Sequence, residues 1–153
     1  MVFVDSDLLV ACLRPLNSKK PAINNFRLKA REKLENLFSQ FSNVKITIYN
    51  MAELYKGAYK SKRTAHNLRL VEAFLSRFEI IAPTTDSAKE FARVWADLEL
   101  KGNEVGLLDQ LIASIVITNH DILITHNVDH FGRIPLLNFE NWGKVAEEGD
   151  SRA

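Results

Sequence analysis

The chain has 153 residues, of which 46% are apolar and 25% charged, and its 20 Lys and Arg residues nearly balance its 19 Asp and Glu residues. This composition is typical of one globular domain and argues against two full domains or a low-complexity chain. Cys12 is the single cysteine, which excludes an internal disulfide and a cysteine-based zinc site, so we expect a cytoplasmic protein. The longest uncharged run, residues 110–120, is too short to cross a bilayer, and we expect no membrane association.

Short apolar runs alternate with helical patterns along the chain. Residues 2–4 form an apolar run that stops at Asp5, and residues 44–49 are rich in β-branched side chains, which favours strands. We predict strands at residues 2–4, 44–49, 78–81, 122–125 and, as a short fifth, 136–137. Between them we predict helices at residues 8–13, 24–41, 50–60, 65–75, 84–100 and 107–119, the third of them capped by Asn50.

This alternation predicts an α/β fold, a three-layer sandwich in which helices flank a central parallel sheet of four to five strands. One domain should cover residues 1–146, and residues 147–153 are expected to form a polar, disordered tail. In a parallel sheet, ligands bind outside the carboxyl ends of the strands. The residues that follow the strands are therefore the candidates for a functional site.

Four polar residues fall at that edge of the predicted sheet. They are Asp5 after the first strand, Glu53 in the helix after the second, Asp109 at the start of a late helix and Asn127 after the fourth strand. Each acid has an ordinary alternative: a turn residue at Asp5, a capping box of Glu53 with Asn50, and a partner for the helix dipole at Asp109. Apolar residues on both sides of Asp109 favour a shared pocket, since an unpaired carboxylate among them is costly.

The basic residues are unevenly distributed along the chain. Residues 14–31 hold six basic residues and residues 56–70 hold five, without an acid in either segment, whereas residues 79–109 hold seven acids against three bases. Solvated helix faces explain many such runs, and a bound polyanion is the alternative. The candidate contacts to a nucleic-acid backbone are Lys56, Lys60, Lys62, Arg63 and Arg69.

Four motifs, in chain order, resemble the PIN-domain nucleases, and among them most closely the VapC-type toxins of type II toxin–antitoxin systems. The motifs are DSDLL from Asp5, ELYKGA from Glu53, DQLIA from Asp109 and THNVDHF from Thr125. Each is short, so the resemblance rests on their order and their place in the predicted elements, and it covers nearly the whole chain. It implies that the catalytic residues are Asp5, Glu53, Asp109 and Asn127, and that Ser6 is the small hydroxyl residue after the first aspartate.

The chain departs from the family pattern at two places. Asn50 stands three residues before the glutamate, where family members often have Ser or Thr. His130 takes the place of the aspartate in the last motif, and Asp129 precedes it. Asp129 is therefore a candidate to replace Asn127 in a metal site, or to complete the site together with it.

Clustered carboxylates raise one another's pKa unless a cation lies between them, so such a cluster predicts a metal site or a site in which the carboxylates share a proton. Oxygen ligands select hard ions such as Mg²⁺ or Mn²⁺. We expect Asp5 and Asp109 to bind the metal directly and Glu53 to bind it through water or to act as a base. An alternative zinc cluster would consist of His120, His126 and His130 with Asp121 and Asp129.

The resemblance implies a metal-dependent endoribonuclease that is neutralised by a small VapB-like antitoxin and forms a homodimer. Ser6 and the basic residues Lys56, Lys60, Lys62 and Arg63 would then contact the RNA. Two alternatives share the fold: an RNA-processing nuclease without an antitoxin, and a catalytically inactive interaction module. A receiver-like signalling domain is discounted, because its third strand should precede a phospho-accepting Asp, and here Ala82 and Pro83 follow.

Overall fold

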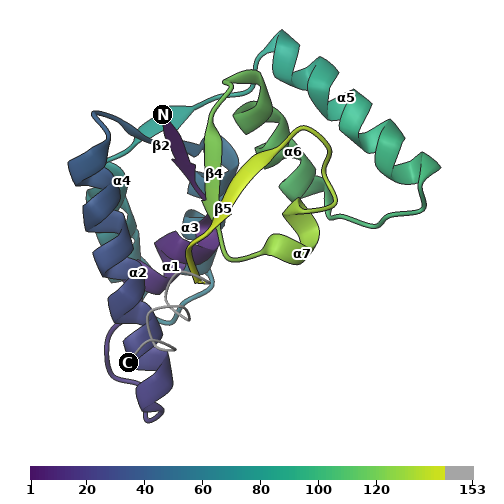
Figure 1. Ribbon diagram of the computed structural model, residues 1–153. Coiled ribbons are helices and arrows are strands. Elements are labelled where there is room, and N and C mark those ends of the chain that lie inside the picture. The colour runs from purple at the N-terminus through teal and green to yellow at the C-terminus, as the bar shows by residue number, and fades with distance from the viewer. Residues whose placement is uncertain (144–153) are drawn as a thin grey trace.

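The computed structural model describes residues 1–143 of the chain (Figure 1). In this part, a five-stranded sheet consists of β1 (Val2–Val4), β2 (Val44–Thr47), β3 (Glu79–Ile81), β4 (Ile122–Thr125) and β5 (Asn138–Asn141). The strand order is β3-β2-β1-β4-β5, and each neighbouring pair is parallel. The predicted parallel sheet is confirmed. The predicted domain boundary at residue 146 and the tail at residues 147–153 lie outside the described residues.

Helices cover both faces of the sheet, which confirms the three-layer sandwich (Figure 1). One face carries α1 (Ser6–Leu13), α2 (Pro21–Gln40), α3 (Ile48–Tyr59) and α4 (Thr64–Leu75), and the other carries α5 (Thr85–Leu100), α6 (Leu107–Thr118) and α7 (Val128–Phe131). Side chains of a strand alternate between the two faces. Accordingly, Val2 and Val4 of β1 belong to the first hydrophobic core, and Phe3 belongs to the second.

The junction between β2 and α3 differs from the prediction. β2 ends at Thr47 rather than at residue 49, because Thr47 is the N-cap of α3: its Oγ1 accepts from the backbone N–H of Asn50. The side chain of Asn50 accepts from the backbone N–H of Thr47 in return. The predicted cap at Asn50 and its capping box with Glu53 are therefore wrong, and Asn50 is fully buried in the first turn.

Other elements also differ from the prediction. α2 begins at Pro21 rather than at residue 24, because the fixed φ of proline suits the first helical position. The fifth strand lies at Asn138–Asn141 rather than at residues 136–137, since Leu136 has a φ of 68°, which interrupts an extended strand. The short helix α7, which buries Phe131, was not anticipated. None of the helices in residues 1–143 combines the length and apolar character needed to cross a membrane.

Candidate active site

The central strands end in polar residues at one edge of the sheet. Asp5 follows β1, Thr47 ends β2 and Thr125 ends β4, and all three side chains are buried. Thr125 Oγ1 donates to Asp5 Oδ2 at 2.8 Å, so the ends of β1 and β4 are linked through their side chains. This is the edge at which parallel sheets bind ligands.

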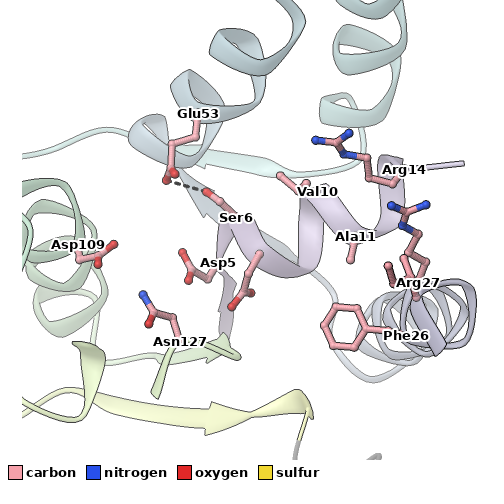
Figure 2. Close-up of a pocket in the computed structure, with 12 residues that line it drawn as sticks. Asp5, Ser6, Val10, Ala11, Arg14, Phe26, Arg27, Glu53, Asp109 and Asn127 are labelled. Atoms are coloured by element: carbon pink, nitrogen blue, oxygen red, sulfur yellow. Dashed lines mark hydrogen bonds between the residues drawn. The ribbon is translucent and has the colours of Figure 1, made fainter. Parts of the chain in front are cut away.

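A pocket of about 740 Å³ opens at this edge, and we call it the acidic pocket. Asp5, Glu53, Asp109 and Asn127, which were predicted as the catalytic residues, all line it together with Ser6 (Figure 2). The rest of its wall consists of Asp7, Val10, Ala11, Arg14, Ile23, Phe26 and Arg27. Asp129 is exposed and lies outside this wall. Of Asn127 and Asp129, the two candidates for the fourth residue of the site, the pocket wall therefore contains Asn127.

A chain of hydrogen bonds runs from β2 to Glu53 through buried side chains. Thr47 Oγ1 donates to Asn50 Oδ1 at 2.7 Å, and Asn50 Nδ2 donates to Ser6 Oγ at 2.9 Å. Ser6 Oγ in turn donates to Glu53 Oε1 at 2.8 Å. Asn50 Nδ2 also lies 3.3 Å from Asp5 Oδ1. Asn50 thus directs the Ser6 hydroxyl toward Glu53 and contacts the most buried acid of the pocket.

Replacement of Asn50 by Ala is expected to lower the free energy of unfolding by about 2–4 kcal/mol, because it leaves the Thr47 and Ser6 groups without their buried partners. Urea unfolding followed by circular dichroism measures the change. Asn36→Ala, at an exposed site in α2, is the matched control and should change stability by less than about 0.5 kcal/mol. Equal effects of the two substitutions would contradict the role assigned to Asn50.

Asp7 lines the pocket, but its carboxylate is occupied by structural hydrogen bonds. It accepts from the backbone N–H of His126 at 2.6 Å, from Trp142 Nε1 at 3.2 Å and from Thr125 Oγ1 at 3.3 Å. These bonds tie the start of α1 to the end of β4 and to the segment after β5. Asp7 therefore braces the site, and it adds a negative charge beside Asp5.

The environment of the pocket changes the acidity of two carboxyl groups. Burial, together with the negative charges of Asp7 and Asp109, raises the pKa of Asp5 to about 7 against opposing hydrogen bonds. Burial also raises the pKa of Glu53, and Asp109 contributes to the same effect. Buried carboxyl groups with raised pKa values in a cleft are typical of catalytic and metal-binding sites.

His130 contacts two residues of the acidic pocket from α7. Its Nδ1 lies 2.9 Å from Asp109 Oδ2 and 3.1 Å from Asn127 Nδ2. The residue that departs from the family pattern therefore lies against both Asp109 and Asn127 at the rim of the pocket, where a protonated Nδ1 donates to Asp109 and an unprotonated Nδ1 accepts from Asn127.

The described residues contain no group of three or more His, Cys, Asp or Glu side chains that could hold a metal ion together. The alternative zinc cluster of His120, His126 and His130 is thus not formed. For Mg²⁺ the carboxylate pocket still fits, because this ion is usually bound by one or two carboxylates and keeps several waters. Asp5 and Asp109 supply such carboxylates, and Asn127 supplies a neutral amide.

Cationic side chains lie at the end of the pocket away from Asp109. Figure 2 shows Arg14, Arg27 and Phe26 at this end, beyond Asp5. Sequence analysis did not single them out, although both arginines belong to the basic segment 14–31 and Arg14 directly follows the helix that begins after Asp5. The predicted contacts Lys56, Lys60, Lys62, Arg63 and Arg69 are exposed and lie outside the pocket wall.

Comparison with known proteins agrees with this geometry. Residues 2–136 match the family model of the PIN domain. Ribonuclease VapC2 from Rickettsia felis is 37% identical over 108 residues, which are 71% of this chain and 81% of that protein. The tRNA(fMet)-specific endonuclease VapC from Salmonella typhimurium is 36% identical over 101 residues, which are 66% of this chain and 76% of that protein.

Solved structures extend the similarity to the whole fold. The crystal structure of VapBC2 from Rickettsia felis, bound to a DNA fragment from its promoter, contains a chain with a TM-score of 0.79 and 30% sequence identity, and the alignment covers 93% of this chain and 99% of that one. The structure of DNA-bound VapBC from Salmonella typhimurium gives a TM-score of 0.77 at 28% identity, with 92% and 97% of the two chains covered. The chain therefore belongs to the PIN domain family, and within that family to the VapC proteins.

Proposed function

We propose that this protein is a metal-dependent endoribonuclease that hydrolyses phosphodiester bonds of RNA, and that it is the toxin of a toxin–antitoxin pair. The acidic pocket carries the proposal, because segments far apart in the sequence bring Asp5, Glu53, Asp109 and Asn127 to one edge of the sheet. The relatives that are named as ribonucleases and as a tRNA endonuclease support RNA as the substrate.

The four predicted catalytic residues and Ser6 each have a role in this proposal. Asp5 and Asp109 would hold a Mg²⁺ or Mn²⁺ ion, with Asn127 as a further oxygen ligand. When bound, such an ion supplies the positive charge that activates water and stabilises the leaving oxygen. Glu53, whose pKa is raised, would accept the proton of the attacking water, and the hydrogen bond from Ser6 would keep its carboxylate oriented.

Arg14 and Arg27 are the best-placed cations for the RNA backbone, because they line the same pocket as the carboxylates. Both would bind phosphates next to the one that is cleaved. Lys56 follows Glu53 on α3 and is exposed, so it stays a candidate for an outer contact, together with Lys60, Lys62 and Arg63.

Removal of divalent ions tests the chemistry. We expect the purified protein to cleave single-stranded RNA in Mg²⁺ or Mn²⁺, to lose at least about a hundredfold in rate in EDTA, and to recover when the ion is restored. Gel analysis of a labelled oligonucleotide measures the rate. Cleavage that persists in EDTA would contradict the metal-dependent mechanism, and a folded protein without cleavage in either ion would favour the inactive interaction module.

A candidate binding surface for an antitoxin lies beside the acidic pocket. An apolar groove of about 270 Å³ lies between α1, α3 and α4, and Val10, Arg14 and Glu53 line both this groove and the acidic pocket. The solved VapBC complexes support a small antitoxin as the occupant, whose binding would block the pocket entrance. A toxin bound by an antitoxin should copurify with the product of an adjacent small gene, and the complex should not cleave RNA. An antitoxin-free nuclease would show neither result. The homodimer and the cytoplasmic location stay predictions.

A further inference from the structure

A second cavity adjoins the acidic pocket. This cavity, the lateral pocket, has a volume of about 910 Å³ and lies between α5, the loop at residues 102–106, the start of α6 and α7. His130 lines it, and Nδ1 of the same side chain lies 2.9 Å from Asp109 Oδ2 in the acidic pocket. A single side-chain contact thus joins the walls of the two cavities. The lateral pocket therefore lies next to the acidic pocket, with His130 and Asp109 between the two.

The lateral pocket presents an aromatic ring that is already held in position. Trp95 is 41% exposed, and its indole stacks on Phe91 with the ring centroids 5.3 Å apart and the planes 30° apart. Arg133 also lines the pocket, where its Nη1 donates to the backbone oxygen of Glu104 at 2.9 Å. An accessible aromatic ring with a guanidinium in the same wall is suited to stacking with an unpaired nucleobase.

Gln110 is a buried polar residue in the same wall. It is only 3% exposed, and its Nε2 donates to the backbone oxygen of Val105 at 2.8 Å. Its Oε1 is buried and has no hydrogen-bond partner among residues 1–143. A buried acceptor without a donor is unfavourable. Because Oε1 is enclosed by the protein, Gln110 forms part of the pocket wall and its acceptor is not open to a ligand.

The two cavities differ in the charged side chains that line them, and the difference suits them to different parts of a nucleotide. Arg14 and Arg27 line the far end of the acidic pocket and suit phosphates. The lateral pocket instead combines Arg133 with the carboxylates of Glu99 and Glu104, which disfavours a phosphate. Carboxylates do accept hydrogen bonds from base amino groups. The lateral pocket is therefore better suited to a base than to the RNA backbone.

We propose that the lateral pocket binds the nucleobase beside the cleaved bond of single-stranded RNA, with Trp95 stacked on that base. The inference rests on the proposed ribonuclease function and adds a subsite that selects the nucleotide next to the cut. Trp95 makes contact with substrate in this arrangement but takes no part in the bond cleavage.

Cleavage kinetics test the subsite. We expect Trp95→Ala to raise KM roughly tenfold, within the range for loss of one base stack, while kcat stays near the wild-type value. Trp95→Phe keeps a ring and should restore most of the affinity. Leu100→Ala is the matched control, because Leu100 lies at the end of the same helix, is 88% exposed and is not part of the lateral pocket wall.

Substrates with one base removed identify the nucleotide that occupies the pocket. An abasic nucleotide at one position beside the cut should weaken binding to the wild type by a factor similar to that of Trp95→Ala. The same substrate should cause no further loss in Trp95→Ala, because the two changes remove one shared contact. The inference would be overturned if the abasic nucleotide weakened binding equally in both proteins at all positions, or if Trp95→Ala left KM unchanged. In either case, RNA cleavage by the wild type would leave the proposed function intact.

A binding measurement separates the subsite from catalysis. The emission of Trp95, taken as the difference between the wild type and Trp95→Phe in EDTA, should change when an RNA oligonucleotide is added. The same change in emission in a protein that does not cleave RNA would support a base-binding pocket at Trp95 and would contradict the proposed ribonuclease function. Emission that responds to protein concentration and not to RNA would assign Trp95 to a contact between copies of the chain and overturn the inference.

Discussion

Replacement of Asp5 by Asn is expected to reduce the rate of RNA cleavage in Mg²⁺ at least about a thousandfold, because an amide cannot supply the negative charge that holds a divalent ion. Asp109→Asn should have a similar effect, since Asp109 lines the same pocket. Single-turnover cleavage at saturating protein measures the loss without a contribution from RNA binding.

Asp129→Asn is the matched control for both substitutions, because Asp129 is an exposed aspartate outside the pocket wall. Its rate should equal that of the wild type. A large loss of cleavage rate in Asp129→Asn would assign the role in the metal site to Asp129 in place of Asn127. Wild-type rates in folded Asp5→Asn and Asp109→Asn would show that the carboxylates of the pocket do not carry the reaction.

The same Asp5→Asn substitution is expected to stabilise the metal-free protein at high pH. Burial raises the pKa of Asp5 from 3.8 to about 7, so the folded state keeps a proton that the unfolded state has lost over this interval. Stability therefore falls as the pH rises from about 4 to 7, and the ionised carboxylate costs on the order of 4 kcal/mol by pH 8. Asn carries no such charge.

Urea unfolding in EDTA at pH 4 and pH 8 measures this effect. The stability of Asp5→Asn relative to the wild type should increase by several kcal/mol between the two pH values, and Mg²⁺ should reduce the difference by stabilising the ionised wild type. Asp129→Asn, at an exposed site, should show no comparable gain. The same relative stability of Asp5→Asn at both pH values would show that Asp5 ionises freely in the folded protein.

The order of the elements and the acids of the pocket could be predicted from the sequence because both depend on local patterns. The apolar run before Asp5 predicted β1 and the position of Asp5 at its carboxyl end, and the structure has both. The alternation of strands and helices predicted a parallel sheet, whose strand ends share one edge. One can therefore predict that acids after different strands meet in one pocket without knowing how the helices pack.

The partners of those acids could not be predicted from local patterns. Asn50 satisfies the sequence rule for an N-cap, but Thr47 takes the cap and Asn50 is buried beside Ser6. Which of the two residues caps α3 depends on where β2 stops pairing with β1 and β3, and this is a property of the sheet. For the same reason Asp7, two residues after Asp5, is recognised as a brace only from its contacts with β4 and Trp142.

The sequence by itself determined the family, the parallel α/β fold and the carboxylates of the site, since these follow from hydrophobic periodicity and from short motifs within single elements. The tertiary structure decided which cations face the acids. α2 packs against α1 and brings Arg27 beside Arg14, whereas the more conspicuous lysines after Glu53 stay exposed outside the pocket. It also decided that His130 joins the acidic and lateral pockets. A side chain's neighbours depend on the packing of distant elements, which no local pattern encodes.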